Sequence, residues 1–283
     1  MIGPRARKWL KRLRREPTLW RRLSASRRLL PNAFIVGAQR SGTTSCYEYL
    51  VQHPKIVGPR WKEVHFFDRA RNYRRGLNWY RANFDLAQSF ERLPAAERPT
   101  IVLDATPEYM FRERATELLA LHLPDARLIA LLRDPVARAF SQYKLAITRQ
   151  SLRGSFEEEV LPLLGQSPDN PTKYKSVALQ IIQRGHYAEQ IERLYAFFPR
   201  EQLHLEMAED LYADPNSCCN RILRHLGLEP FDLPDPRPRN SSANRASLSP
   251  AAEAELRAYY APHNARLAEL LGRDLPWASS TTD

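Results

Sequence analysis

The sequence lacks the features that mark several classes of protein. Its 283 residues include only three cysteines, Cys46, Cys218 and Cys219, too few and too clustered for a disulfide framework, which favours a reducing compartment. No uninterrupted apolar run approaches the roughly 20 residues of a membrane-spanning helix. Hydrophobic residues make up 43% of the chain, enough to build a sizeable core, so a wholly disordered protein is excluded.

Acidic residues are almost missing from the N-terminus. The first 30 residues hold one acidic residue, Glu16, against eleven basic ones, so this segment carries +10 of the total formal charge of +11. The remaining 253 residues are nearly neutral, with a net charge of +1. A basic protein invites the hypothesis of nucleic-acid binding, but here the charge is confined to one end, and no specific nucleic-acid partner is expected.

Residues 1–30 are therefore interpreted as a basic amphipathic arm, and residues 31–283 as a single domain. Such an arm either contacts an anionic membrane or polymer, or packs on the domain through its tryptophans Trp9 and Trp20. The arm lacks the apolar core of a secretory signal. Together with 36 arginines against 7 lysines, this favours a bacterial protein that is cytoplasmic, with peripheral membrane contact through the arm as a hypothesis.

Short apolar runs alternate with helical segments after Pro31. This alternation predicts an α/β fold: a P-loop-like parallel sheet with helices on both faces and a helix-rich C-terminal half. The expected strands are Ala33–Gly37, Thr100–Ala105, Arg127–Leu132 and about Leu203–Glu206. The expected helices are about Thr43–His53, Glu108–His122, Pro135–Arg149, Phe156–Leu164, Val177–Phe198, Asp214–Leu226 and Pro250–Leu271.

A candidate phosphate loop follows the first strand. Gly37 and Gly42 are spaced as G-x-x-x-x-G between a strand and a helix, which turns backbone N–H groups toward a phosphate. A nucleotide triphosphatase continues with Lys and Ser/Thr, whereas Thr43 and Thr44 stand here, and no Asp is placed to hold Mg²⁺. The loop therefore indicates one phosphate group without a metal, with Arg40 as its cation. A glycine-rich turn that binds nothing is the alternative.

A second candidate anion site follows the strand that ends at Leu132. Arg133 stands at the carboxyl end of this strand, where open α/β sheets bind ligands, and Ser141 lies eight residues on in the next helix. The two side chains can converge on a second phosphate. The alternative is a surface ion pair of Arg133 with Asp134 beside an unrelated serine.

Together the two segments resemble the sulfotransferases that use 3′-phosphoadenosine 5′-phosphosulfate (PAPS). Further segments are similar to the heparan sulfate 3-O- and N-sulfotransferase branch: WKEVHFFD (61–68), ATPEYM (105–110), RGHY (184–187) and LGRDLPW (271–277). Two positions depart from that branch, which has lysine at the places of Arg40 and Ala105. The resemblance implies transfer of a sulfuryl group from PAPS to a hydroxyl or amine of a carbohydrate-like acceptor.

The resemblance also implies roles for individual residues. Glu63 is the expected general base, with a pKa raised by the apolar Trp61, Val64, Phe66 and Phe67, unless it forms a surface pair with Lys62 or Arg60. His65, which faces the same side in an extended segment, is expected to bind the sulfuryl group or orient Glu63; a structural histidine is the alternative. Tyr187 either lines the acceptor cleft or belongs to the core. The expected PAPS contacts are Arg40, Ser41, Gly42, Thr43, Thr44 and Ser45 at the phosphosulfate, Arg133 and Ser141 at the 3′-phosphate, and Asn244 and Arg245 in a lid.

Two other functions compete with this hypothesis. A P-loop kinase-like phosphotransferase shares the loop geometry, but the missing lysine and the missing Mg²⁺ ligand argue against it. A non-catalytic polyanion-binding protein on the same fold is favoured by the basic arm and disfavoured by the presence of Glu63, Arg133 and Ser141.

Overall fold

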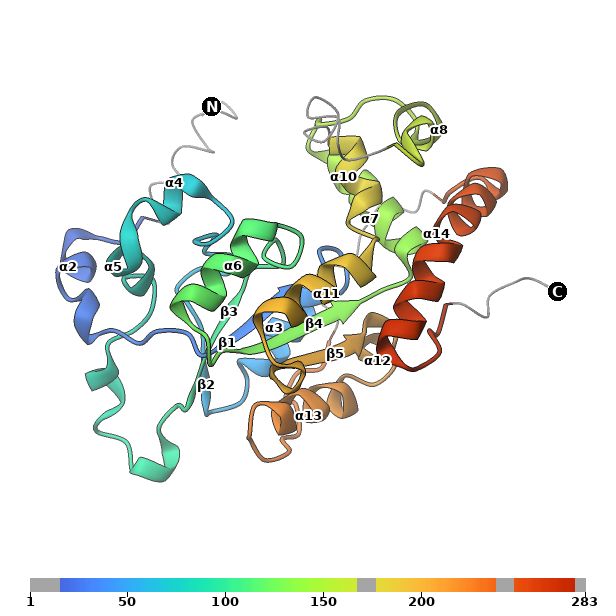
Figure 1. The fold of residues 1–283 in the computed structure, drawn as a ribbon. Helices are drawn as coiled ribbons and strands as arrows, with labels where there is room; N and C mark the ends of the chain where they lie inside the picture. The colour runs from blue at the N-terminus through green and yellow to red at the C-terminus, as the bar shows by residue number, and fades with distance from the viewer. Residues whose placement is uncertain (1–15, 167–176, 238–246, 278–283) are drawn as a thin grey trace.

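A five-stranded parallel sheet forms the centre of the molecule in a computed structural model that describes residues 16–166, 177–237 and 247–277. The strand order is β2-β3-β1-β4-β5, with β1 in the middle (Figure 1). In register, Ala33 of β1 lies opposite both Leu103 of β3 and Arg127 of β4. The strands are β1 (Ala33–Gly37), β2 (Ile56–Val57), β3 (Ile101–Ala105), β4 (Arg127–Leu132) and β5 (Leu203–Met207).

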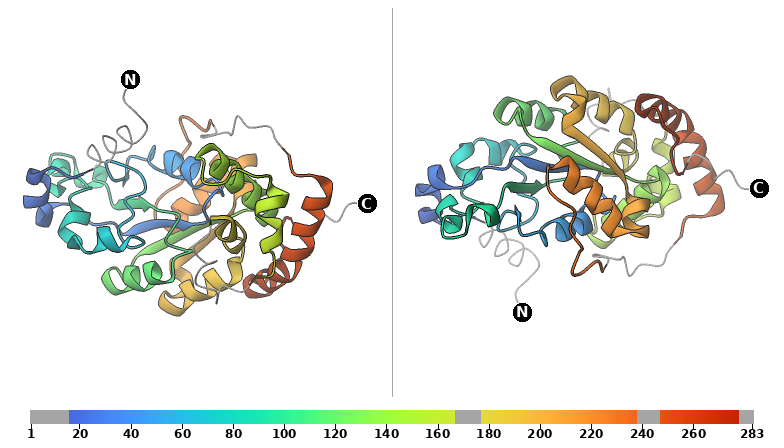
Figure 2. Two further views of the ribbon diagram at one scale, coloured as in Figure 1. Left: turned by 90° about the horizontal axis from the view of Figure 1, so that it is seen from above. Right: turned by 90° about the horizontal axis from the view of Figure 1, so that it is seen from below.

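Helices cover both faces of the sheet, which confirms the predicted α/β class. On one face α3 (Thr43–Leu50) and α13 (Pro215–His225) pack over the strands, and on the other face lie α6 (Glu113–His122) and α11 (Tyr187–Phe197). The two layers are visible on either side of the sheet in Figure 2. All three cysteines are buried and free in the first of these layers, consistent with the absence of a disulfide framework.

A third apolar cluster stands beside the sheet. It joins α7 (Pro135–Thr148), α8 (Phe156–Glu159), α10 (Val177–Gln183) and α14 (Pro250–Leu271). Leu256 and Tyr260 of α14 are fully buried in this cluster, and the Tyr260 hydroxyl donates to the Ile182 carbonyl at 2.8 Å. This cluster positions α7, the helix that carries Ser141. Among the described residues, no helix is both long and apolar enough to cross a bilayer.

Several helices begin or end at other residues than the sequence predicts. The expected helix Val177–Phe198 is two helices, α10 and α11, separated by a turn that contains Gly185. Gly185 lies against Tyr260, and a Cβ added there would be 2.7 Å from the tyrosine ring. The expected helix Phe156–Leu164 ends at Glu159 and continues as a 3₁₀ turn around Pro162, which has no N–H to donate. Helix α6 begins at Glu113, five residues later than predicted.

Several short elements were not predicted, among them β2, α4 (Ala70–Tyr73), α5 (Gly76–Arg81) and α12 (Ala208–Ala213). A two-residue strand gives no periodic signal, and α12 follows β5 without an intervening turn. The structure also contains short 3₁₀ helices at Ala25–Arg27, Ala87–Phe90, Ala95–Glu97, Leu161–Leu163 and Arg200–Gln202.

Residues 16–30 pack on the domain through arginines. Arg21 of α2 (Leu19–Leu23) donates to the Ala82 and Phe84 carbonyls, which follow α5 (Gly76–Arg81), at 2.7 and 2.5 Å. Arg28 donates to the same Phe84 carbonyl at 2.9 Å. The expectation that Trp20 packs this segment on the domain is wrong, because 64% of Trp20 is exposed; Trp9 lies outside the described residues. The neighbouring α4 (Ala70–Tyr73) completes this end of the molecule.

Candidate active site

The phosphate loop connects β1 to the first turn of α3. Gly42 precedes this helix with a left-handed backbone (φ 79°), and no side chain caps the helix N-terminus. The space beside Gly42 is limited, since a Cβ there would lie 3.1 Å from Leu211 and 3.2 Å from Tyr212. The loop therefore presents backbone N–H groups and the positive end of a helix, an arrangement suited to an anion.

The two predicted anion sites meet in space. Arg40 Nε donates to Ser141 Oγ at 3.1 Å, and Arg133 donates to the Arg40 carbonyl oxygen at 3.2 Å. The phosphate loop after β1 and the segment after β4 are thus joined by side-chain hydrogen bonds across adjacent strands. In the described part of the chain Arg133 and Asp134 form no ion pair within 4 Å; Asp134 instead caps α7 by accepting from the Val136 N–H at 3.0 Å.

Arg40 and Arg133 bring positive charge together without a neutralising carboxylate. Burial and then the neighbouring Arg133 charge lower the pKa of Arg40. Among the described residues no carboxylate lies within 4 Å of either guanidinium, and both groups donate to neutral oxygens. Two adjacent cations at a helix N-terminus, neither of them in ion-pair contact with a described carboxylate, fit the phosphate groups of a nucleotide.

The predicted hydroxyls of the loop divide into a buried and an accessible group. Ser41, Thr43 and Ser45 are buried, whereas Thr44 is half-buried and its Oγ1 accepts from Lys62 Nζ at 3.3 Å. Tyr187 is a core residue, 1% exposed, and its hydroxyl donates to the Arg133 carbonyl at 2.9 Å. Its function is therefore to hold the end of β4 under the loop. Asn244 and Arg245, expected in a lid, lie outside the described residues.

Lys62 connects the loop to Glu63 and was not among the predicted site residues. Its Nζ lies 3.3 Å from Thr44 Oγ1 and 3.3 Å from Glu63 Oε1, and only 15% of its side chain is exposed. The ion pair of Glu63 with Lys62, which the sequence offered as the alternative to a catalytic base, is therefore present. It lies beside Thr44 in the first turn of α3 and not on a remote surface turn. The pair itself brings Glu63 to the phosphate loop.

The expected rise in the Glu63 pKa is wrong. The contact with His65, whose Nε2 lies 3.5 Å from Glu63 Oε2, lowers the pKa of Glu63 to about 2, and Lys62 acts in the same direction against burial. The apolar neighbours in the sequence suggested desolvation, but two cationic groups outweigh it. The side chain remains 42% exposed, so a substrate can reach the carboxylate.

His65 is held between two carboxylates. Burial lowers its pKa, but hydrogen bonds with Asp68 (2.8 Å) and Glu63 outweigh burial and raise the pKa to about 9. The imidazole is therefore protonated at neutral pH and donates from both nitrogens. The segment is not extended as expected, since Glu63 and His65 both have left-handed φ angles of 63° and 55°. The two side chains meet nevertheless.

An aromatic core supports this strained segment. Phe66 stacks on Tyr80 with ring centroids 4.6 Å apart, and the Phe66 N–H donates to the Tyr109 hydroxyl at 3.1 Å. The hydroxyls of Tyr80 and Tyr109 donate to the buried Asp104 at 2.8 and 3.2 Å, and burial raises the pKa of Asp104 to about 6. The aromatic residues that suggested a raised Glu63 pKa thus fix the backbone instead.

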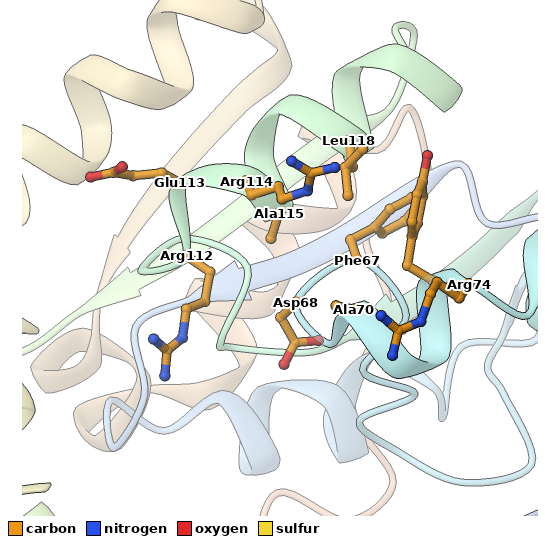
Figure 3. A pocket seen from close by; sticks show the side chains of 10 residues that line it. Phe67, Asp68, Ala70, Arg74, Arg112, Glu113, Arg114, Ala115 and Leu118 are labelled. Carbon is orange, nitrogen blue, oxygen red and sulfur yellow. The ribbon is translucent and has the colours of Figure 1, made fainter. Parts of the chain in front are cut away.

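A cavity of about 450 Å³ opens next to this segment (Figure 3). Asp68, the hydrogen-bond partner of His65, is among its lining residues, and in the view of Figure 3 it lies between Arg74 and Arg112. The lining residues are Phe67, Asp68, Ala70, Tyr73, Arg74, Arg112, Glu113, Arg114, Ala115 and Leu118.

Tyr212 is a second residue that sequence reasoning missed. It belongs to α12, is 49% exposed, and its ring lies 5.9 Å from the Arg133 guanidinium carbon. Because α12 was not predicted, nothing in the sequence placed Tyr212 beside Gly42.

The Sulfotransferase domain model matches residues 30–247. This chain belongs to the sulfotransferase family. It is 28% identical over 280 residues to the human bifunctional heparan sulfate N-deacetylase/N-sulfotransferase 3, a match covering 87% of this chain and 31% of that relative. With the mouse heparan sulfate glucosamine 3-O-sulfotransferase 5 the identity is 26% over 271 residues, covering 88% and 74% of the two chains.

Solved structures agree with this family. A sulfotransferase from Alicyclobacillus acidocaldarius superposes with a TM-score of 0.68 at 30% identity, over 87% of this chain and 98% of the other. The sulfotransferase domain of the Synechococcus PCC 7002 olefin synthase shares the fold, with a TM-score of 0.53 at 20% identity over 88% and 97% of the two chains. The sulfotransferase is thus an enzyme, and the resemblance to the heparan sulfate branch is confirmed.

Binding of a simple phosphate anion tests the loop of the sulfotransferase directly. We expect millimolar inorganic pyrophosphate to raise the melting temperature of the wild-type protein by about 2–4 °C, the shift for a ligand near ten times its Kd. Arg40→Gln should abolish most of this shift because it removes a guanidinium at the loop. The measurement is differential scanning fluorimetry at constant ionic strength.

The control is Arg98→Gln, which removes an exposed arginine that donates only to the Leu93 and Glu91 carbonyls. An equal shift in Arg40→Gln and Arg98→Gln would show that pyrophosphate acts elsewhere.

Proposed function

We propose that this sulfotransferase transfers the sulfuryl group of PAPS to a hydroxyl or amine of a carbohydrate-like acceptor, with Glu63 as general base. The observation that carries the proposal is the junction of Arg40 with Ser141 and Arg133. It links the two segments that the family uses for the two ends of one nucleotide.

The residues present fit a donor with two separate phosphate positions. Gly42, Thr43 and Thr44 at the α3 N-terminus, with Arg40, would hold the 5′-phosphosulfate, and Arg133 with Ser141 would hold the 3′-phosphate. PAPS supplies a sulfuryl group attached to a phosphate that leaves as an anion. Arg40 and the helix N-terminus stabilise negative charge at the place where it increases.

Lys62 is placed to contribute to this charge stabilisation. It lies between Thr44 of the loop and Glu63, 3.3 Å from each. Lys62 thus places an ammonium group at the phosphate loop, although this chain has Arg40 and Ala105 at the two positions where the related branch has lysine. Lys62 thereby keeps Glu63 ionised and orients it toward the loop.

Glu63 is suited to accept the acceptor proton because it is ionised and accessible. A carboxylate with a pKa near 2 is a weak base, so exclusion of water by a bound acceptor must raise its basicity. His65, protonated and hydrogen-bonded to Asp68, orients Glu63 and does not itself act as a base.

The cavity beside Asp68 is the proposed entrance for the acceptor. Arg74, Arg112 and Arg114 line it, and these cations favour a carbohydrate that already carries carboxylate or sulfate groups. The names of the curated relatives, which act on heparan sulfate, point to the same acceptor class.

The alternatives make different predictions. Membership of the sulfotransferase family leaves no observation in favour of a P-loop kinase. A non-catalytic polyanion-binding protein would bind 3′-phosphoadenosine 5′-phosphate or the acceptor polymer without any transfer of labelled sulfate.

Replacement of the proposed base separates binding from chemistry. We expect Glu63→Gln to lower kcat for transfer of ³⁵S from PAPS to heparan sulfate by about 10²–10⁴-fold, because the amide cannot accept a proton. Binding of 3′-phosphoadenosine 5′-phosphate, measured by calorimetry, should be unchanged. Glu48→Gln, an exposed position on α3, is the matched control with normal turnover.

Two outcomes contradict different parts of this proposal. Full turnover in Glu63→Gln would exclude Glu63 as the base while leaving the sulfotransferase activity intact. Nucleotide binding without transfer by the wild-type protein, to heparan sulfate and to its desulfated forms, would argue for the non-catalytic alternative.

The pH dependence of kcat/KM tests the Glu63–His65 pair. Glu63 is ionised above about pH 2 and His65 is protonated below about pH 9, so we expect a level profile between these values and a fall above about pH 9. His65→Asn removes the largest cause of the low Glu63 pKa. The acidic limb should then move to higher pH, and the alkaline limb due to His65 should disappear.

Lys62→Met is the matched comparison. It should also move the acidic limb upward, since Lys62 lowers the pKa of Glu63, but it retains His65 and its alkaline limb. A His65→Asn profile identical to that of the wild type would refute the pairing.

A further inference from the structure

Helix α2 turns its apolar side chains to solvent. Leu19, Trp20 and Leu23 are 71%, 64% and 72% exposed, and no residue of α2 is buried. Three large apolar residues within five positions form a compact patch, which is unusual on the surface of a soluble domain. We call Leu19, Trp20 and Leu23 the α2 face.

The orientation of the helix is fixed from its polar side. Arg21 donates to the Ala82 and Phe84 carbonyls, and Arg28 donates to the Phe84 carbonyl and to Ser24 Oγ, so two arginines face the domain. Ordinary amphipathic packing would place the leucines inward. Here the backbone carbonyls after α5 bind the arginines, and the apolar residues are left outside.

Basic residues are frequent in the sequence on both sides of the α2 face. Arg22 and Arg27 are exposed on the same segment. The preceding residues 1–15 contain seven basic residues and no acidic residue. The nearest acidic group in sequence, Glu16, is already paired with Arg75 at 2.7 Å.

The α2 face stands at an end of the molecule. In Figures 1 and 2, α2 lies at the extremity opposite α14, in all three views. Helix α2 therefore lies at the periphery of the domain. The site built on β1 and β4 is located toward the centre of the same views.

We propose that the α2 face docks the enzyme on an anionic lipid bilayer. Leu19, Trp20 and Leu23 enter the interface between headgroups and acyl chains, a region that tryptophan favours, and the surrounding arginines contact the negative headgroups. Apolar insertion flanked by basic charge is the combination that interfacial binding requires. Charge complementarity favours this occupant over a second copy of the chain, because two basic faces repel each other.

Vesicle sedimentation with the full chain tests this proposal. We expect binding to vesicles of phosphatidylcholine mixed with phosphatidylserine, weaker binding to phosphatidylcholine alone, and a decrease with added salt. The double variant Leu19→Asp/Leu23→Asp should bind the mixed vesicles at least about tenfold more weakly, because both the apolar contact and the charge complementarity are reduced.

The matched control carries the same added charge elsewhere. Leu121→Asp/Phe197→Asp changes two exposed apolar residues of α6 and α11, 71% and 45% exposed, and should bind vesicles almost as the wild type does. Melting curves and binding of 3′-phosphoadenosine 5′-phosphate establish that both variants are folded.

Three results would overturn the proposal. Equal loss of binding in the two double variants would show that net charge alone is responsible. Unchanged binding in Leu19→Asp/Leu23→Asp would assign the contact to another segment, such as residues 1–15. A wild-type dimer in light scattering that Leu19→Asp/Leu23→Asp converts to a monomer, without any vesicle binding, would identify a second copy as the occupant.

Discussion

The hydrogen bonds that join Arg40 to Ser141, and Arg133 to the Arg40 carbonyl, are the constraint on which the rest of the site depends. They connect the turns after β1 and β4, which are neighbours in the sheet although about a hundred residues apart in sequence. Parallel strands place these turns at the same edge of the sheet, so the two candidate anion-binding groups form one surface. Tyr187 fixes this surface from below through the Arg133 carbonyl, and Gly42 lets the backbone turn into α3.

Charge rather than burial governs the second half of the site. Glu63 stands between Lys62 and the protonated His65, which lower its pKa, and Asp68 holds His65 from the far side. Lys62 also donates to Thr44, so the same ammonium joins Glu63, the proposed base, to the phosphate loop. The left-handed backbone at Glu63 and His65 is maintained by the aromatic core around Phe66 and by the hydrogen bonds of Tyr109 and Asp104. This strained segment connects the phosphate loop, through Lys62, to the cavity proposed for the acceptor, through Asp68.

Four of the five strands, and the positions of the two candidate anion-binding segments beside them, could be predicted because their signals are local: an apolar run for each strand, and glycine, arginine and serine at fixed spacing after it. Val177–Phe198 has the composition of one helix, but the structure divides it at a turn in which Gly185 packs against Tyr260, a residue far along the chain. The pKa of Glu63 was misjudged because neighbours in sequence were taken as neighbours in space, whereas Phe66 points into the core and His65 turns back. The roles of Lys62 and Tyr212 depend on tertiary contacts that no local pattern contains.

The central claim is that one nucleotide spans the Arg40–Ser141–Arg133 surface, and a crystal structure with 3′-phosphoadenosine 5′-phosphate tests it most directly. The account predicts the 5′-phosphate at the N–H groups of Gly42–Thr44 beside Arg40, and the 3′-phosphate within hydrogen-bonding distance of Arg133 and Ser141. A nucleotide bound with its 3′-phosphate away from Arg133 and Ser141, or with its 5′-phosphate away from the α3 N-terminus, would contradict it.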